Sequence, residues 1–462
     1  MKSKKDYNIA IDLINKYNKS GPRYTSYPTA PEWSNEFTDI SAFEAIKKDN
    51  QNSDNKISLY VHIPFCWSLC FYCGCNVITT RDKDHAIKYL KYLEKEINLF
   101  AKNVNSERSV SQIHWGGGSP TYLSEEQISK VYSMLKNNFN IDKDAEISIE
   151  IDPRITRKTH LDTLKELGFN RISMGIQDFD EKVQKTINRI QTYEFTKDII
   201  DYCRKLDFIS VNTDLIYGLP YQNLEEFAKT LELINIINPD RIALFNYAHI
   251  PSIRPAQKKF PIESLPQAEL KIKLFNLAIN SFIDNGYVYI GLDHFAKPSD
   301  ELYIAQINKT LRRNFMGYTT KADTSLYAFG LTSISETKNT YIQNHKDIDT
   351  YYKCLDDNKL PVMRGLNLSH DDLIRKEIIM NLTCNLELDK KEIEEKYQIN
   401  FNEYFKNELI ECKELESDGL IDIFDEKIIV KSQGQILIRN VSMIWDSYLK
   451  RAGNKKLFSK TI

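Results

Sequence analysis

The chain has 462 residues, 42% of them hydrophobic and 27% charged, as in a globular protein with a sizeable core. Lys and Arg number 62 and Asp and Glu 64, and this net charge of −2 argues against a chain that mainly grips nucleic acid or an anionic membrane. No apolar run approaches the roughly 18 residues of a membrane span, and Asp12 and Lys16 interrupt the N-terminal apolar stretch, so we expect a cytoplasmic protein without a signal peptide.

Six apolar, β-branched runs alternate with helix-length amphipathic stretches after a polar, proline-punctuated segment over residues 1–55. Such alternation predicts right-handed βαβ units and a parallel sheet, and six units are too few for a closed eight-stranded barrel. We therefore expect an α/β fold with a partial (β/α)6 barrel over 56–265. The predicted strands are ISLYVHIP, QIHW, EISIEID, RISMGIQ, ISVNTDLIYGLP and RIALFNYAHI.

The second half of the chain is predicted to complete the barrel and then to form a separate unit. A helix is expected over 267–287, followed by irregular chain over 291–302 and 314–330, within a segment 266–365 that completes the barrel. Residues 366–462 show three helical stretches and then two strands with a turn over 420–440, the outline of a winged helix. Residues 371–462 carry 15 Lys and Arg against 18 Asp and Glu, so an accessory domain is favoured over a DNA-binding module.

Four of the eight cysteines lie within ten residues, in HIPFCWSLCFYCGCN. Clustered thiols in an intracellular chain point to metal or redox chemistry, and zinc sites usually pair two short Cys or His spacings from separate segments, which this chain lacks. The spacing Cys66-x3-Cys70-x2-Cys73 fits an iron–sulfur cube better, with three protein ligands and one open iron. Two alternatives remain: Cys75 as a fourth ligand of a closed electron-transfer cluster, or four structural cysteines.

The cysteine spacing, with Tyr72 before the last ligand, resembles the radical S-adenosylmethionine superfamily. The wider set of motifs is similar to the oxygen-independent coproporphyrinogen III dehydrogenases and runs in register from about residue 20 to past 440. These motifs are RYTSYPT, YVHIPFC, CGCN, HWGGGSPTYL, EIDPR, SMGIQDF, NTDLIYGLP, FNYAHIP, DHFAKPSDEL and NFMGYTTKADT. The resemblance implies a radical S-adenosylmethionine barrel with an N-terminal extension that covers the substrate and a mostly helical, winged-helix-like C-terminal domain.

The resemblance also implies the roles of individual residues. Cys66, Cys70 and Cys73 would hold a 4Fe-4S cluster whose fourth iron binds S-adenosylmethionine, and a second S-adenosylmethionine is expected. Tyr60 and Cys75 are the candidates for a direct part in the reaction. The cofactor contacts implied by the matching positions are Tyr60, Tyr72, Gly117, Gly118, Ser119, Glu150, Gln177, Arg189, Asp214, Ala248 and Ile334.

Several of these positions also have a purely structural interpretation from the residues alone. Gly116, Gly117 and Gly118 can form a tight strand-to-helix turn, and without a following Gly-Lys-Ser/Thr they do not predict nucleotide triphosphate binding. Tyr60 can simply pack under the cysteine loop, and Arg189 can be a solvated helix residue.

The reaction that the resemblance implies is the oxidative decarboxylation of two propionates of coproporphyrinogen III, on rings A and B, to vinyl groups. It would give protoporphyrinogen IX through a 5′-deoxyadenosyl radical, with an unidentified reductant and electron acceptor, in a monomer. A polyanionic substrate predicts basic groups at the barrel mouth, among them Arg23, Arg312 or Arg313. A haem-handling relative without decarboxylase activity, or a plain iron–sulfur electron carrier, are the alternatives.

Overall fold

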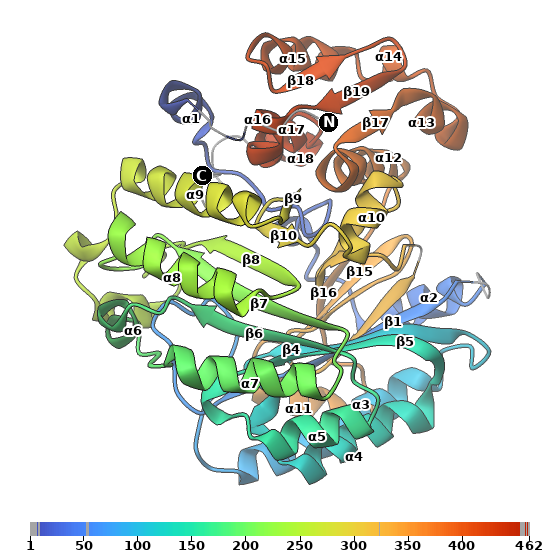
Figure 1. Cartoon of the computed structure of the whole chain (residues 1–462). Helices are drawn as coiled ribbons and strands as arrows, with labels where there is room; N and C mark the ends of the chain where they lie inside the picture. The colour runs from blue at the N-terminus through green and yellow to red at the C-terminus, as the bar shows by residue number, and fades with distance from the viewer. Residues whose placement is uncertain are drawn as a thin grey trace.

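The computed structural model describes residues 7, 10–51, 55–322, 324–452, 458 and 460. Its core is a partial barrel, above which a smaller domain formed by the C-terminal residues lies in Figure 1. In the described part of the chain, no helix has the length and apolar character needed to cross a membrane.

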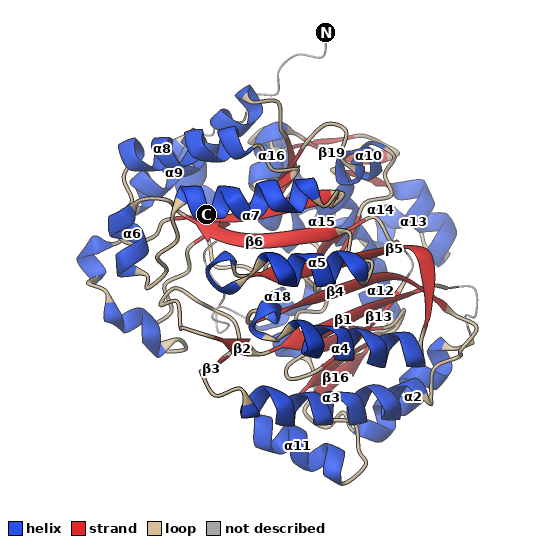
Figure 2. Ribbon diagram, turned by 60° about the horizontal axis from the view of Figure 1, so that its bottom comes forward, coloured by secondary structure: helices blue, strands red, loops and turns tan. Residues whose placement is uncertain are grey.

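Six parallel strands form the barrel wall and pair in chain order. They are β1 (Ile57–Ile63), β4 (Ser109–Gly117), β5 (Asn140–Ile151), β6 (Arg171–Gln177), β7 (Ser210–Tyr217) and β8 (Arg241–Asn246). The helices that connect them or follow them are α3 (Asp84–Ala101), α4 (Glu125–Asn138), α5 (Lys158–Glu166), α6 (Glu181–Thr186), α7 (Tyr193–Lys205), α8 (Leu224–Ile237) and α9 (Ala268–Asp284). The predicted partial (β/α)6 barrel is confirmed, and Figure 2 shows α3, α4, α5 and α7 along one side of the sheet.

Local sequence explains why these helices form and which face they bury. In α3 the residues Ala86, Leu90, Leu93 and Ile97 recur at helical spacing and are all buried against the sheet. The helix α4 begins at a capping box in which the Ser124 side chain accepts from the backbone N–H of Gln127.

The sheet continues on both sides of the six strands. Beyond β1 lies β13 (Ser325–Phe329), parallel to it, followed by the antiparallel β14 (Ile334–Glu336), β15 (Thr340–Asn344) and β16 (Val362–Asn367), with α11 (Ile348–Asp356) between the last two. Beyond β8 lie the antiparallel β10 (His294–Ala296) and β9 (Val288–Gly291).

The stretches predicted as irregular contain regular structure. They hold β10, β13 and β12 (Gly317–Thr319), and between them lie most of α10 (Glu301–Ile307) and of β11 (Arg312–Asn314), which forms a hairpin with β12. Strands of three residues are too short to show a period of two, and β13 is buried on both faces, so neither gives an alternating pattern.

The N-terminal segment lies against both the barrel and the C-terminal domain. It contains α1 (Ile11–Tyr17) and α2 (Asp39–Asp49), and the chain between them is anchored by buried tyrosines. Tyr24 Oη donates to Asp446 Oδ2 at 3.0 Å, and Tyr27 Oη lies 3.2 Å from Ser447 Oγ. The RYTSYPT motif is therefore a connector between the two units.

The C-terminal domain is mostly helical with a three-stranded antiparallel sheet in the order β17-β19-β18. Its elements are α12 (His370–Met380), a π-helical turn (Asn381–Asn385), β17 (Glu387–Asp389), α13 (Lys390–Tyr397), α14 (Phe401–Tyr404), α15 (Lys406–Ser417), β18 (Ile421–Ile423), β19 (Lys427–Val430), α16 (Ser432–Ile436), α17 (Ile438–Met443) and α18 (Ser447–Ala452). The predicted second strand ends at Val430, and the chain after it is helical because Leu437, Ile438 and Val441 enter the domain core at helical spacing.

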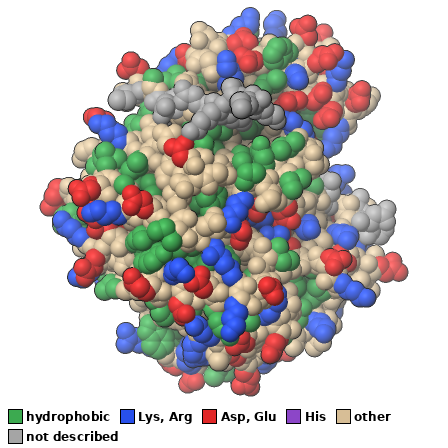
Figure 3. All heavy atoms as spheres, viewed as in Figure 1, with side chains coloured by type: hydrophobic (Ala, Val, Ile, Leu, Met, Phe, Trp, Pro, Cys, Tyr) green, Lys and Arg blue, Asp and Glu red, His purple; other side chains and the backbone are tan. Residues whose placement is uncertain are grey.

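The surface carries mixed charge. On the face shown in Figure 3, Lys and Arg side chains are interspersed with Asp and Glu and form no single basic stripe. This agrees with the near balance of charges in the whole chain.

Candidate functional site

The clustered cysteines lie on one loop at the end of β1. The short parallel strands β2 (Phe65–Cys66) and β3 (Ile78–Thr79) bracket this loop, which appears at the lower left of Figure 2. Its backbone is held from outside, because Phe71 N–H donates to Ile187 O at 2.9 Å and Asn188 Nδ2 donates to Leu69 O at 2.8 Å. All four cysteines line one cavity of about 230 Å³, which we call the cysteine cavity.

Two guanidinium groups contact the buried Cys70. Arg154 Nη2 lies 3.5 Å and Arg189 Nη1 3.7 Å from its Sγ, and Asp152 pairs with both arginines, at 2.6 Å from Arg154 and 3.5 Å from Arg189. Arg189 is only 6% exposed. Two guanidinium groups and one carboxylate therefore fix the surroundings of the Cys70 sulfur.

The other thiols differ in their protonation. Burial raises the pKa of Cys66 to about 12. The hydrogen bond between the side chains of Cys73 and Cys75 lowers the pKa of Cys73 to about 6 and raises that of Cys75. Cys73 is thus readily deprotonated at neutral pH, and the Cys75 thiol donates a hydrogen bond to its sulfur.

The donor set of this cavity fits an iron–sulfur cluster better than one metal ion. Among the described residues, no three His, Cys, Asp or Glu side chains converge as the ligands of a single ion would. Cysteine ligands of a cluster bind separate irons and need not converge. Gln177 Oε1 and Arg189 Nε are buried in the same cavity wall without a hydrogen-bond partner, so polar groups remain for a bound ligand.

The glycines at the end of β4 pack closely against His62 of β1 and Phe65, at the start of the cysteine loop. Gly117 has φ +114°, and a Cβ there would lie 2.6 Å from the His62 ring. A Cβ on Gly118 would lie 2.7 Å from the Phe65 carbonyl oxygen. Only glycine fits these contacts. Ser119 is 3% exposed, with Oγ 3.4 Å from Thr121 Oγ1, and lies behind the cavity wall.

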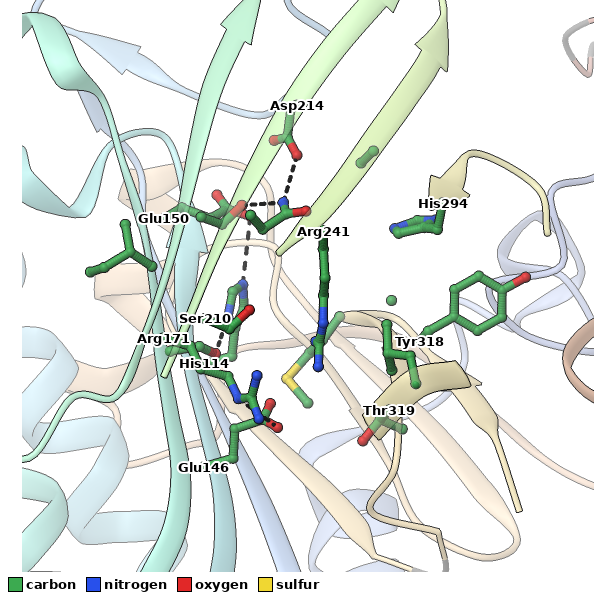
Figure 4. Close-up of a pocket in the computed structure, with 18 of the residues that line it drawn as sticks. His114, Glu146, Glu150, Arg171, Ser210, Asp214, Arg241, His294, Tyr318 and Thr319 are labelled. Atoms are coloured by element: carbon green, nitrogen blue, oxygen red, sulfur yellow. Dashed lines mark hydrogen bonds and ion pairs between the residues drawn. The ribbon is translucent and has the colours of Figure 1, made fainter. Parts of the chain in front are cut away.

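Two carboxylates face the barrel interior from β5 and β7, which lie on either side of β6 (Figure 4). Burial alone would raise the pKa of Glu150, but His114, with Nε2 at 3.6 Å, and the Gly117 N–H, at 3.2 Å, hold it below its usual range. Burial and the nearby Glu150 charge raise the pKa of Asp214 to about 7. Near neutral pH the two groups therefore differ in charge.

A second cavity of about 270 Å³ adjoins the first and shares Cys75, Gly117 and Glu150 with it. Tyr60 and Ile334 line this second cavity. Tyr60 Oη lies 3.1 Å from His62 Nδ1, and burial lowers the pKa of His62 to about 4, so this imidazole is neutral at pH 7.

The structure thus brings most of the predicted site residues to two adjoining cavities. The cysteine cavity is lined by Cys66, Cys70, Tyr72, Cys73, Cys75, Gly117, Gly118, Glu150, Gln177, Arg189 and Asp214. Ala248 is exposed and reaches the site only through Gln257, whose Nε2 donates to the carbonyl oxygens of Ala248 and Tyr72.

Of the arginines predicted at the barrel mouth, Arg23 lies with its guanidinium 5.8 Å from the ring of Phe245, which lines the cysteine cavity. Arg23 pairs with Asp293, whereas Arg312 and Arg313 line a separate cavity. The sequence analysis missed His114, Asp152 and Arg154 as site residues. The sequence did contain a signal for these residues. His114 lies just before the three glycines, and Asp152 and Arg154 belong to the EIDPR motif at the end of a predicted strand.

The far end of the barrel is closed by ion pairs (Figure 4). Arg171 and Arg241 come from the first residues of β6 and β8. Their Nη2 atoms lie 2.6 Å and 3.0 Å from Glu301 Oε1, and Arg171 also pairs with Glu146 at 3.2 Å. They line an interior cavity of about 180 Å³ together with Glu150 and Asp214.

Comparisons with known proteins identify the family. Residues 60–234 match the model of the Radical SAM superfamily, and 368–437 match the HemN C-terminal domain. The chain is 46% identical over 458 residues to the oxygen-independent coproporphyrinogen III oxidase of Synechocystis sp., covering 98% of each chain. The chain belongs to the family of oxygen-independent coproporphyrinogen III oxidases.

Two further comparisons, one with an Escherichia coli sequence and one with an Escherichia coli structure, show how completely the chain matches. The Escherichia coli oxygen-independent coproporphyrinogen III oxidase is 45% identical over 457 residues, which cover 99% of each chain. The solved structure of coproporphyrinogen III oxidase (HemN) from Escherichia coli, described as a radical SAM enzyme, superposes with a TM-score of 0.91 over 96% of this chain and all of that one, at 43% identity. The resemblance found in the sequence motifs and the radical SAM fold are confirmed.

Proposed function

We propose that this oxidase-family chain decarboxylates two propionate side chains of coproporphyrinogen III to vinyl groups without dioxygen, giving protoporphyrinogen IX. The observation that carries this is the cysteine cavity, in which Cys66, Cys70 and Cys73 face Glu150, Asp214 and Arg189. The relatives that match over the whole chain are named for that activity.

Cys66, Cys70 and Cys73 would hold a 4Fe-4S cluster whose fourth iron is left for S-adenosylmethionine. When bound, the reduced cluster supplies the one electron that cleaves S-adenosylmethionine into methionine and a 5′-deoxyadenosyl radical. Arg154 and Arg189 would hold the Cys70 sulfur in position through their hydrogen bonds to it.

The residues around the cluster would bind and orient S-adenosylmethionine. The ionised Glu150 and the carboxyl of Asp214 face the interior and are suited to ribose hydroxyls. Gly117 and Gly118 let the backbone approach the ligand closely, and Tyr72 lines the same cavity. Ser119 acts from behind the wall, by fixing the turn.

A second S-adenosylmethionine is part of the proposal. Its support is the second cavity, lined by Tyr60, Cys75 and Ile334, which meets the cysteine cavity at Glu150. In the adjoining cysteine cavity, Gln177 and Arg189 offer a buried carbonyl oxygen and a buried N–H that no group of the described residues satisfies. Ala248 would contribute only through the backbone that Gln257 holds.

For each of the two propionates, one hydrogen atom would leave the β-carbon for the 5′-deoxyadenosyl radical. Carbon dioxide would then depart, and the remaining electron would pass to an external electron acceptor. The protein must hold that carbon near the radical and exclude water, since the difficult chemistry belongs to the cofactor. Tyr60 and Cys75 line the second cavity and are the candidates for assisting this step.

The remaining assignments follow from the same family. We propose a cytoplasmic monomer with an external reductant and no nucleic-acid or membrane partner. We propose four segments: 1–55 covers the substrate, 56–265 is the radical barrel, 266–365 completes it, and 366–462 is accessory. The contacts of Tyr24 and Tyr27 with the C-terminal domain support joint closure by the first and last segments.

Anaerobic incubation of the reconstituted chain with S-adenosylmethionine, a one-electron reductant and coproporphyrinogen III tests the function. The expected products are protoporphyrinogen IX, carbon dioxide and 5′-deoxyadenosine. If deoxyadenosine forms without vinyl product, the result would indicate the haem-handling alternative. If neither product forms, the result would support the iron–sulfur electron carrier. Cys203→Ser, at a buried cysteine of α7 outside the cavity, is the control that should keep activity.

A further inference from the structure

A large cavity lies at the end of the strands opposite the cysteine loop. Its volume is about 510 Å³, within the range of small-molecule sites. Asn55 precedes β1 and Ser325 begins β13, whereas the cysteines follow the other end of β1. Because β1 and β13 are parallel, this cavity and the cluster loop lie at opposite ends of the sheet. We call it the rear cavity; Leu326 forms its wall against the second cavity.

The lining of the rear cavity is strongly basic. Its cations are Arg312, Arg313, Lys321, Lys338, Lys376 and Lys396, and its carboxylates are Glu336 and Glu377. The formal excess is six positive against two negative side chains, or +4. This contrasts with a whole chain of net charge −2.

The two carboxylates neutralise only part of this charge. Glu336 pairs with Lys376 at 2.7 Å, and Glu377 is shared by Lys396 at 3.0 Å and Arg312 at 3.6 Å. Among the described residues, which omit 52–54 and 323 and with them Asp54 and Asp323, Lys321 and Lys338 form no ion pair. Two ammonium groups therefore face the cavity without a carboxylate among those residues.

Arg313 adds a buried cation with an unused donor. The residue is 8% exposed, its Nη1 donates to the Arg23 carbonyl oxygen at 2.9 Å, and its Nε has no hydrogen-bond partner among the residues that the structure describes. Burial lowers the pKa of this guanidinium, and the charge of Arg23 lowers it further. An anion in the cavity would offset that charge and offer an acceptor.

The uncharged part of the lining combines an apolar surface with the polar side chains of Asn55, Asn314, Thr319, Thr324, Ser325 and Thr337, and the apolar surface limits the ligand class. Leu326, Leu373, Met380 and Tyr397 present hydrocarbon and ring surface to the same space. Inorganic phosphate would satisfy the cations and leave this surface without contact, whereas a ligand with an apolar body and several carboxylates matches both parts.

We propose that the rear cavity is a second binding site for an amphipathic polycarboxylate, distinct from the cofactor cavities. The proposed substrate and product belong to this chemical class, and in that respect the inference rests on the proposed function. The site would hold a tetrapyrrole by its propionates without bringing it to the cluster.

Fluorescence titration of the anaerobic holoprotein with coproporphyrin III, a stable tetracarboxylate, tests this. We expect two binding events, one at the barrel mouth and one at the rear cavity. The double variant Lys321→Glu/Lys338→Glu should weaken one event by about tenfold or more, because each lost cation removes a charged contact. Lys413→Glu, at an exposed lysine of α15, is the matched control and should change neither event.

The outcomes separate the two proposals. An unchanged titration in the double variant would overturn the rear site, even if the wild type forms vinyl product. Loss of an event in that variant would support the site, even if no vinyl product forms and the proposed function fails. Displacement by pyrophosphate at the concentrations that suffice for coproporphyrin would overturn the amphipathic class. Formation of 5′-deoxyadenosine at the wild-type rate verifies that the variant is folded.

Discussion

Arg189 and Cys70, which are 119 positions apart in the chain, meet at 3.7 Å between Nη1 and Sγ. The same guanidinium donates to the Gly175 carbonyl oxygen at 2.6 Å and lies 3.5 Å from Asp152. One planar cation thus links the cysteine loop to the ends of β5 and β6, the strands that carry Glu150 and Gln177. Cys70, which we propose as a cluster ligand, and the opposite wall of the cysteine cavity are fixed relative to each other by this side chain.

Replacing Arg189 by lysine should therefore impair the site although the charge is kept. A single ammonium cannot reach sulfur, carbonyl and carboxylate in the geometry of a guanidinium fork. We expect the rate of deoxyadenosine formation to fall about tenfold or more, with less iron bound per chain after reconstitution. Arg204→Lys on α7, at a surface arginine, should leave both values unchanged. Wild-type iron and rate in Arg189→Lys would contradict this role.

Gly117→Ala should weaken S-adenosylmethionine binding by about tenfold or more. The added Cβ would lie 2.6 Å from the His62 ring, so the turn or the ring must move at a cost of about 1–3 kcal/mol. Equilibrium dialysis with the reconstituted protein measures this. Gly286→Ala is the matched control, because that glycine also has positive φ, +86°, but open space around it. Equal affinities in the two variants would mean that the close contact at Gly117 is unimportant.

The pKa of Asp214 predicts a pH dependence of stability. It is raised from 3.8 to about 7, so the folded apoprotein holds this proton more tightly than the unfolded chain. Relative to Asp214→Asn, the wild type should lose stability as pH rises from about 4 to about 7 and then remain level. The change should be a few kcal/mol at most, since the carboxyl faces a cavity that water can enter. Denaturant unfolding at several pH values measures it; a difference independent of pH would refute the shift.

Cys75→Ser should leave the iron content of the reconstituted protein unchanged. Cys75 donates to Cys73 rather than occupying a ligand position in our assignment, so serine can replace it in that hydrogen bond. Cys73→Ser, two positions away, should lose cluster iron. Iron loss in Cys75→Ser equal to that in Cys73→Ser would make Cys75 a fourth ligand and remove the open iron.

The six barrel strands could be predicted because each is long enough to show a buried apolar pattern, as in Ile57–Ile63. The hairpin at Arg312 and the strand β13 could not, because the hairpin strands are three residues long and β13 finds its partner β1 more than 250 positions away. Such pairing depends on tertiary context rather than on local sequence.

The part of the site that could be predicted consists of residues that lie together in short sequence motifs. Cys66, Cys70 and Cys73 and the glycines after β4 could be named from spacing and resemblance, and the structure gathers them. Arg23 could not be assigned in this way, because the sequence does not show which group an arginine pairs with. In the structure its partner is Asp293. The paired roles of Asp152 and Arg154 emerge only once two strand ends meet at Cys70.

Iron spectroscopy of the reconstituted, isotopically labelled protein tests the central claim most directly. With three cysteine ligands, one iron of the cluster should differ from the others and change its Mössbauer parameters when S-adenosylmethionine is added. Four equivalent irons that do not respond to S-adenosylmethionine would contradict the account.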